Sequence, residues 1–199
     1  MTQATENVAR TGLDITDAGS IRAAIAFARD RFGVLDGVVN AAGVAAFGPA
    51  MELDEDAFRR SLDINLTGAF LLSREAAKAL PDGGRIVHLA SVSSFVANAN
   101  YAAYASSKAG LAQLIRVLAR EWASRGICVN AIGPAVIETD LSRPYLDDPA
   151  YRKNALASIP MGRLSVTDDL MGTLVLLLAP GGAFITGQTI YVDGGRTTA

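Results

Sequence analysis

The strongest constraint on the fold is an alternation of short apolar runs with longer segments in which apolar residues recur with helical spacing. Such short runs are typical of buried strands, and the longer segments are typical of helices. Because regular alternation produces a parallel sheet with helices on both faces, we predict a doubly wound, Rossmann-like α/β fold in a single domain spanning residues 1–199. We expect strands at 10–15, 35–40, 85–91, 127–133 and 188–195, and helices at 18–32, 54–80, 102–125 and 167–179.

Composition and charge exclude several kinds of protein. The formal net charge is −2, whereas nucleic-acid-binding proteins usually carry a basic excess. No apolar run is long enough to cross a bilayer and no signal peptide opens the chain, so we expect a cytoplasmic protein. The single cysteine, Cys128, cannot form an internal disulfide and is expected to be a buried structural thiol. No group of histidine, cysteine and carboxylate residues has metal-ligand spacing, so no metal site is expected.

The carboxyl ends of the expected strands bring polar residues to one edge of the sheet. Right-handed crossovers place the loops after the strands at this edge, where open α/β sheets bind ligands. Asn40, Ser91 and the segment that begins at Pro134 follow three of the strands. A serine there can hydrogen-bond a substrate oxygen. The only histidine, His88, lies in mid-strand on the face opposite to Ser91, and we expect it to be a packed, hydrogen-bonded residue.

The helix expected at 102–125 begins with two tyrosines and a lysine, YAAYASSK. Tyr104 lies four residues before Lys108 and Tyr101 lies seven before it, so both phenols share the lysine's side of the helix. A cation one turn away lowers the pKa of a phenol from about 10, which suits proton transfer to or from an alcohol or ketone oxygen. Taken alone, such a pair is also typical of an exposed helix surface. No side chain accepts a hydride, so this chemistry implies a nicotinamide cofactor.

A series of short motifs runs along the chain in a fixed order, each of them weak by itself. They are LDITD (13–17), NAAG (40–43), NLTG (65–68), Ser91 thirteen residues before Tyr104 of YASSK, VNAIGPAVIETD (129–140), MGRLSVTDDL and ITGQTIYVDGG. The ordered set resembles the short-chain dehydrogenase/reductase family over nearly the whole chain from residue 11.

The resemblance implies an oxidoreductase that interconverts a secondary alcohol and a ketone with NAD or NADP. Tyr104 is then the acid/base, and Lys108 lowers its pKa and hydrogen-bonds the nicotinamide ribose. Ser91 orients the substrate oxygen, and Asn65 holds a water in a proton relay through Lys108. Tyr101 becomes a packing or substrate-pocket residue. The residues expected to line the cofactor are Asp14, Ile15, Asn40, Ala41, Gly43, Tyr104, Lys108, Pro134, Ile137 and Thr139.

The substrate is expected to be a small molecule, but the sequence does not identify it. By the resemblance, the segment 140–165 forms the lid over the substrate. This segment has no charge pattern that selects one substrate class. The candidate substrates therefore include small secondary alcohols, polyols, sugar acids and 3-oxoacyl groups.

The sequence also departs from the family. Members of the family begin with a strand, a glycine-rich TGxxxGxG turn, a helix and a second strand. The turn binds the cofactor pyrophosphate, and the second strand selects NAD or NADP. None of these elements is found in this sequence. We therefore expect strand 10–15 to lack a neighbour and strand 35–40 to present an open apolar edge. Alternatively, the two pair with each other and displace Asp14 and Ile15. Ala135 stands where the family usually has glycine, and it strains the loop if its φ is positive.

Three interpretations follow from this departure. In the first, the chain is a dehydrogenase whose coding sequence begins upstream of Met1, and an in-frame glycine-rich turn there would support it. In the second, it is a non-catalytic partner in an oligomer. The resemblance also implies a homodimer or homotetramer formed through the helices at 55–80 and 102–125. In the third, it is an isomerase or dehydratase that needs no cofactor. The intact set of expected catalytic residues favours the first.

Overall fold

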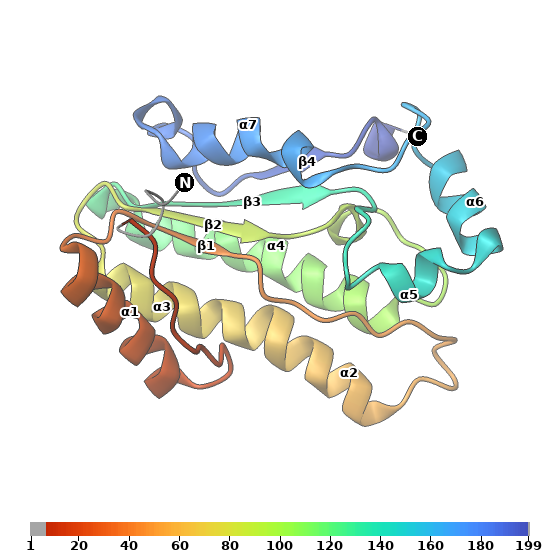
Figure 1. The fold of residues 1–199 in the computed structure, drawn as a ribbon, viewed down its shortest axis with the longest axis horizontal. Helices are drawn as coiled ribbons and strands as arrows, with labels where there is room; N and C mark the ends of the chain where they lie inside the picture. Colours follow the sequence, from red (N-terminus) through yellow and green to blue (C-terminus); the bar gives the residue numbers. More distant parts are fainter. Residues whose placement is uncertain (1–6, 199) are drawn as a thin grey trace, which may run out of the picture.

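The centre of the molecule is a sheet of four parallel strands in the order β1-β2-β3-β4, as the computed structural model of residues 7–198 shows (Figure 1). The strands are β1 (Gly37–Asn40), β2 (Arg85–Leu89), β3 (Cys128–Pro134) and β4 (Thr189–Val192). The helices are α1 (Ala18–Phe32), α2 (Glu55–Leu62), α3 (Ala69–Ala79), α4 (Ala102–Trp122), α5 (Arg143–Leu146), α6 (Pro149–Ala157) and α7 (Thr167–Leu178). Between residues 7 and 198, no helix is long and apolar enough to cross a membrane.

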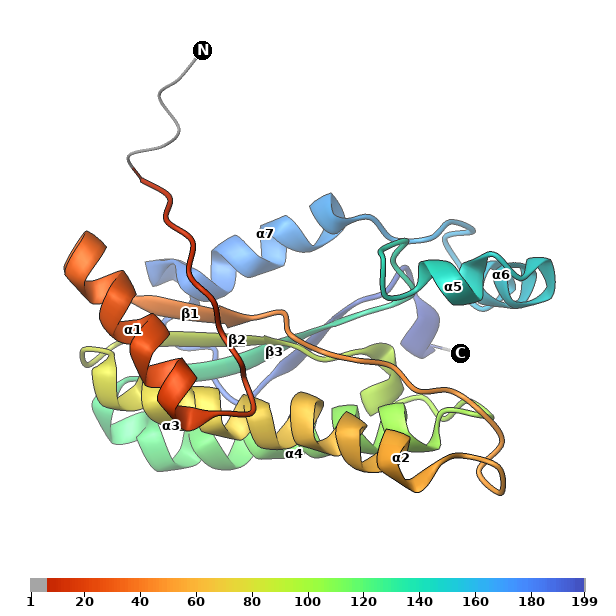
Figure 2. The ribbon, with the colours of Figure 1, turned by 60° about the horizontal axis from the view of Figure 1, so that its bottom comes forward.

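Helices cover the two faces of the sheet unequally. The face that carries α3 and α4 also has α1 and α2 on its side, whereas α7 lies on the opposite face (Figure 2). Beneath α3 and α4 the core includes Ile86, Ile115 and Val129, which are 0% exposed. A smaller cluster beneath α7 centres on Val87 and Leu177. Successive residues of β2 thus point to opposite faces, and the parallel sheet with helices on both faces confirms the expected α/β fold.

The long helix expected from residue 54 to residue 80 forms with one irregularity. Asp54 caps it, because its carboxylate accepts the backbone N–H of Ala57 at 3.0 Å. Between α2 and α3, however, Asp63–Gly68 form a π-helical turn that the sequence did not predict. Such turns insert an extra residue into a helix and occur often at functional sites. Here the turn carries Asn65, which is only 1% exposed.

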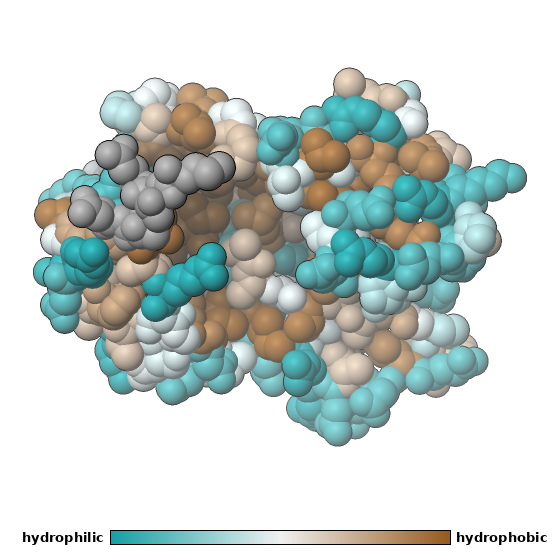
Figure 3. All heavy atoms as spheres, in the orientation of Figure 1, coloured by the Kyte–Doolittle hydropathy of each residue, from teal (hydrophilic) through white to brown (hydrophobic). Residues whose placement is uncertain are grey.

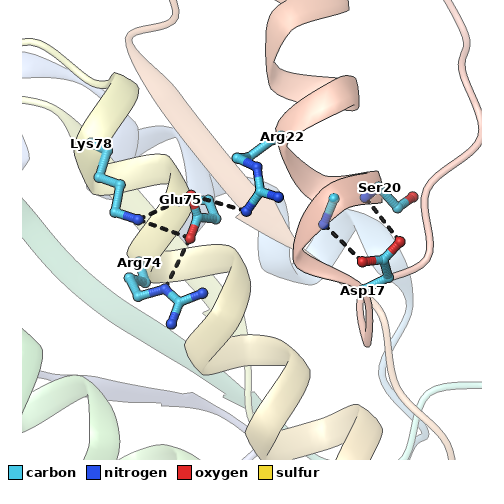
Figure 4. A network of polar contacts seen from close by, with 7 residues as sticks. Asp17, Ser20, Arg22, Arg74, Glu75 and Lys78 are labelled. Atoms are coloured by element: carbon cyan, nitrogen blue, oxygen red, sulfur yellow. Dashed lines mark hydrogen bonds and ion pairs between the residues drawn. The ribbon is translucent and has the colours of Figure 1, made fainter.

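Polar contacts attach α1 to α3 (Figure 4). Asp17 caps α1 by accepting two backbone N–H groups of the first turn at 2.8 and 3.2 Å. On α3, the buried carboxylate of Glu75 lies 3.0 Å from the ammonium of Lys78 and 4.0 Å from the guanidinium of Arg22 on α1. The hydrogen bond from Lys78 is the main reason why the pKa of Glu75 is lowered.

The strand expected at 10–15 is not formed, so this prediction is wrong. A strand requires a neighbour that accepts its ladder of hydrogen bonds, and β1 pairs with β2 alone among the described strands. The alternative, in which this segment pairs with β1, is not observed either. Instead, the backbone N–H of Asp14 donates to the Ser20 hydroxyl at 2.8 Å, and Ile15 packs against Leu72 of α3.

The edge of the sheet at β1 is open, as expected. Val39 is 41% exposed and lines the same cavity as Met171 and Leu174 of α7. Figure 3 shows apolar surface in a hollow between α7 and the strands. The strand is therefore buried on one face only, where Val38 packs against the core beneath α3, because a strand is covered only where other elements pack on both its faces.

The loop after β3 is not strained at Ala135. Of the non-glycine residues described, Asn100 is the one with a positive φ, at 70°. Asparagine tolerates this left-handed conformation better than most residues. The strain considered for Ala135 therefore does not arise, and the alanine is compatible with the loop.

Candidate active site

A cleft of about 900 Å³ lies at the carboxyl ends of the strands. Its walls come from the loops after β1, β2 and β3, from the first turns of α4, and from α5, α6 and α7. This is the edge at which the topology predicts a ligand site. The predicted residues that line it are Ala41, Gly43, Ser91, Tyr104, Lys108, Pro134, Ile137 and Thr139.

Ser91 and Tyr104 both line the cleft. Ser91 is held in place because its hydroxyl accepts the backbone N–H of Ser93 at 3.1 Å. Burial raises the pKa of Tyr104, and the influence of the Ser91 hydroxyl acts in the opposite direction. The expected net lowering of this pKa by Lys108 is not found, because desolvation outweighs the stabilisation of the phenolate.

Lys108 follows one helical turn after Tyr104 and is 4% exposed. Its Nζ donates to the carbonyl of Leu89 at 2.7 Å and lies 5.8 Å from the centre of the Tyr104 ring. Burial lowers the pKa of Lys108 to about 8. An ammonium has three N–H donors, and within residues 7–198 this lysine uses one of them in a hydrogen bond. Two donors are thus available to a ligand in the cleft.

Gly43 keeps the space beside this ammonium open. A Cβ at this position would lie 3.5 Å from Lys108 Nζ and 3.2 Å from Asn65 Oδ1. The absence of a side chain therefore allows the loop after β1 to approach both polar groups closely.

Asn65 lies behind the cleft wall and not on it. Its Oδ1 accepts the backbone N–H of Val44 at 2.9 Å, and its Nδ2 donates to the Val44 carbonyl and to the Ser107 hydroxyl, both at 2.9 Å. Both amide protons are therefore used, and the side chain ties the loop after β1 to α4. This geometry shows a positioning contact; the expected water relay stays a prediction.

Asn40 was expected at the cofactor, but its side chain faces the only histidine. Asn40 Nδ2 lies 3.1 Å from His88 Nδ1, and the Ser73 hydroxyl lies 2.8 Å from His88 Nε2. Asn40 Oδ1 also accepts the backbone N–H of Ala42 at 3.1 Å, which shapes the loop beside the cleft. The prediction of a packed, hydrogen-bonded histidine is confirmed, and burial lowers the pKa of His88 to about 3.

Besides Asn40, two more of the predicted cofactor residues do not line the cleft. Asp14 is exposed, and its carboxylate accepts hydrogen bonds from the backbone and the hydroxyl of Thr16 at 2.9 and 2.7 Å. Ile15 is buried against α1 and α3. Because no strand forms at 10–15, nothing holds either residue at the edge of the sheet.

Aromatic rings cover one part of the cleft, and the sequence pointed to only some of them. Phe47 stacks on Tyr101 with ring centres 4.1 Å apart, and its centre is 5.5 Å from that of Tyr104 and 4.5 Å from that of Tyr145. The hydroxyls of Tyr101 and Tyr151 are 2.6 Å apart. Tyr101 thus packs within the pocket wall. Phe47 was missed because a single apolar residue in a loop carries no periodic signal.

Comparisons with known proteins support the class that this geometry defines. A sequence profile of the family described as Enoyl-(Acyl carrier protein) reductase matches residues 1–197. D-threitol dehydrogenase of Mycolicibacterium smegmatis is 39% identical over 187 residues, which cover 92% of this chain and 71% of that protein. The 3-oxoacyl-[acyl-carrier-protein] reductase of Salmonella typhimurium is 37% identical over 185 residues, which cover 92% of this chain and 75% of that protein.

Solved structures agree with the sequence comparison. A gluconate 5-dehydrogenase from Burkholderia cenocepacia, solved in complex with NADP and tartrate, superimposes with a TM-score of 0.88 at 32% identity and covers 94% of this chain and 74% of that one. The fold and the site define a Rossmann-like oxidoreductase scaffold. Within that class, the chain belongs to the short-chain dehydrogenase/reductase family. It spans about three quarters of the length of the relatives named here.

Proposed function

We propose that this protein is an NAD- or NADP-dependent oxidoreductase that interconverts a secondary alcohol and a ketone. The observation that carries the proposal is that Ser91, Tyr104 and Lys108 line the same cleft, with Lys108 Nζ 5.8 Å from the centre of the Tyr104 ring. The relatives named above are dehydrogenases and reductases, which supports the same class of reaction.

Ser91 and Tyr104 have different roles in the proposed proton transfer. Ser91 donates a hydrogen bond to the substrate oxygen and holds it beside the Tyr104 phenol. A raised pKa keeps that phenol protonated at neutral pH, so in the direction of reduction Tyr104 gives its proton to the developing alkoxide. A bound nicotinamide supplies the hydride acceptor or donor that no side chain provides.

The cleft fits the nicotinamide end of such a cofactor. The buried ammonium of Lys108 has donors to spare beside the open space at Gly43, which suits the hydroxyls of a ribose. Ile137 and Thr139 line the same cleft from the loop after β3. The fit is partial, because no glycine-rich turn for a pyrophosphate is found between residues 7 and 198.

That partial fit favours a second candidate, a non-catalytic homologue that acts as a subunit of a homodimer or homotetramer. The helices expected to form the contacts expose Phe70 at 37% and Val117 at 44%, on α3 and α4. Light scattering measures the assembly directly, and a monomer would count against the subunit role.

Nucleotide binding tests the proposal and separates the two candidates. We expect NADH or NADPH to bind saturably, as followed by nucleotide fluorescence, and we expect Lys108→Ala to lose this binding. Lys153→Ala is the matched control, because Lys153 is an exposed lysine on α6 outside the cleft. Failure of folded protein to bind either nucleotide would reject the oxidoreductase function and favour the non-catalytic subunit.

A further inference from the structure

The charged residues that line the cleft are few and unevenly placed. They are Lys108, Asp140 and Arg196. The side chain of Asp140 is 96% exposed and already accepts from Arg143 at 2.9 Å. Among the lining residues, neither cation therefore has a carboxylate to neutralise it. Lys108 belongs to the proposed proton chemistry, which leaves the role of Arg196 to be explained.

A well-defined turn after β4 holds Arg196 in place. Gly194 and Gly195 have φ values of 61° and 90°, which other residues rarely adopt. The buried carboxylate of Asp193 accepts the backbone N–H groups of Gly195 and Thr197 at 3.0 and 2.8 Å. Arg196 lies between these two groups, so its backbone is fixed by the turn.

Two contacts attach this segment to the loop that carries Ser91. The guanidinium of Arg196 donates from Nη2 to Asn98 Oδ1 at 3.0 Å. The Tyr191 hydroxyl of β4 lies 3.0 Å from the Ser94 hydroxyl, which donates to the Ser91 carbonyl at 2.7 Å. The guanidinium is therefore tied to the loop at whose start the substrate oxygen is proposed to bind.

The guanidinium has capacity for a ligand. It carries five N–H donors in a planar fork that matches the two oxygens of a carboxylate. The bond to Asn98 is the one that its side chain makes with residues 7–198. Within residues 7–198 no carboxylate forms an ion pair with this guanidinium, and its half-buried position makes an unpaired charge more costly than it would be on an exposed surface.

We infer that Arg196 is a specificity-determining residue that binds the carboxylate of a hydroxy acid or oxo acid substrate. The inference rests on the proposed function, because Ser91 and Tyr104 hold the reacting oxygen while Arg196 holds the acid group. Asn98 and Asn154 line the same cleft and provide amide groups for further hydroxyls. The substrate class is thus a polyhydroxylated carboxylic acid, and neutral polyols and thioesters lack the group that Arg196 recognises.

Binding of a matched pair of ligands tests this inference without turnover. D-gluconate and D-glucitol differ in a carboxylate that replaces a hydroxymethyl group. We expect calorimetry to show that the protein binds D-gluconate at least about tenfold more tightly, the order expected of a charged hydrogen-bonded pair. Arg196→Met should abolish the preference, and Arg196→Lys should restore part of it. Arg116→Met is the control, because it removes the same charge from the exposed surface of α4.

Each result has a defined meaning. Equal affinity for the two ligands, no binding of either, or a preference that survives in Arg196→Met would overturn the inference. The nucleotide titration with Lys108→Ala stands apart from this measurement, since no nucleotide is present here. A protein that binds nucleotide but shows no carboxylate preference is an oxidoreductase of another substrate class. A carboxylate preference without nucleotide binding would leave Arg196 as an acid-binding residue in a protein that is not an oxidoreductase.

Discussion

The two faces of the sheet differ in how completely they are packed. On the face beneath α3 and α4, Ile86 and Ile115 are 0% exposed. On the other face Leu177 of α7 is equally buried, but Val39 of β1 is 41% exposed. The first face is a closed core, whereas the second is half covered and opens into the cleft. The core that stabilises the fold therefore lies mainly on the first face, whereas the second face leaves room for a ligand.

The unequal packing has a physical cost. Apolar surface that stays in water forgoes about 25 cal/mol per Å² of stabilisation. An unpaired strand edge also offers free backbone N–H and C=O groups to other chains. The open face is thus the side at which ligands or other polypeptides gain most by binding. Four substitutions test this division between the faces.

The largest effect is expected at the cleft, from Tyr104→Phe. Loss of the phenolic hydroxyl, which exchanges a proton with the substrate oxygen, should reduce turnover of an alcohol by about 10²- to 10⁴-fold, while the ring keeps its packing. Nicotinamide absorbance follows the rate. Tyr101→Phe is the control and should keep most of the rate, because Tyr101 contacts Tyr151 and Phe47 within the pocket wall. Equal losses in the two variants would remove Tyr104 from its proposed role.

The next effect concerns the closed core. Ile115→Ala should lower the free energy of unfolding by about 2–5 kcal/mol, because it leaves a cavity among fully buried neighbours. Val39→Ala on the open face should change it by no more than about 1 kcal/mol, because 41% of this side chain is already exposed. Urea unfolding measures both. Similar losses in the two variants would mean that the open face is as well packed as the closed one.

His88 on the closed face should make stability depend on pH. Its pKa is about 3 in the folded protein, against 6.5 as the ordinary value. Below about pH 6.5 the His88 imidazole is therefore protonated in the unfolded chain but not in the folded one. The free energy of unfolding consequently decreases as the pH falls from about 6.5 towards about 3. The slope is about 1.4 kcal/mol per pH unit. Because the chain has one histidine, His88→Gln should flatten the dependence of the unfolding free energy on pH in this range. An unchanged slope would contradict the burial of a neutral imidazole.

The smallest effect is expected from Arg22→Ala at the contact between α1 and α3. The Arg22 side chain is 61% exposed and lies 4.0 Å from Glu75, which Lys78 already approaches at 3.0 Å. Because the arginine of this pair is exposed to solvent and the carboxylate keeps its closer partner Lys78, the pair contributes only about 0–1 kcal/mol. Thermal unfolding should show a slight decrease, smaller than that of Ile115→Ala. A decrease as large as that of the core variant would show that α1 depends on this single contact.

Local signals in the sequence predicted most of the elements. Asp17 and Gly33 delimit α1 because one accepts the free N–H groups of a first turn and the other adopts a positive φ, 85°, that stops the helix. Asp54 acts in the same way for α2. The spacing between Tyr104 and Lys108 correctly placed both on the cleft wall, because the helical period fixes which residues share a side.

The sequence by itself thus determined the order of strands and helices, the parallel sheet, and the edge at which Ser91, Tyr104 and Lys108 meet. These follow from periodicity, caps and the handedness of crossovers, which are properties of neighbouring residues. Only the tertiary structure decided that 10–15 is not a strand and that Arg196 lies beside the loop of Ser91. Each depends on partners distant in the chain: a strand needs a neighbour to accept its hydrogen bonds, and a cleft needs walls from many segments.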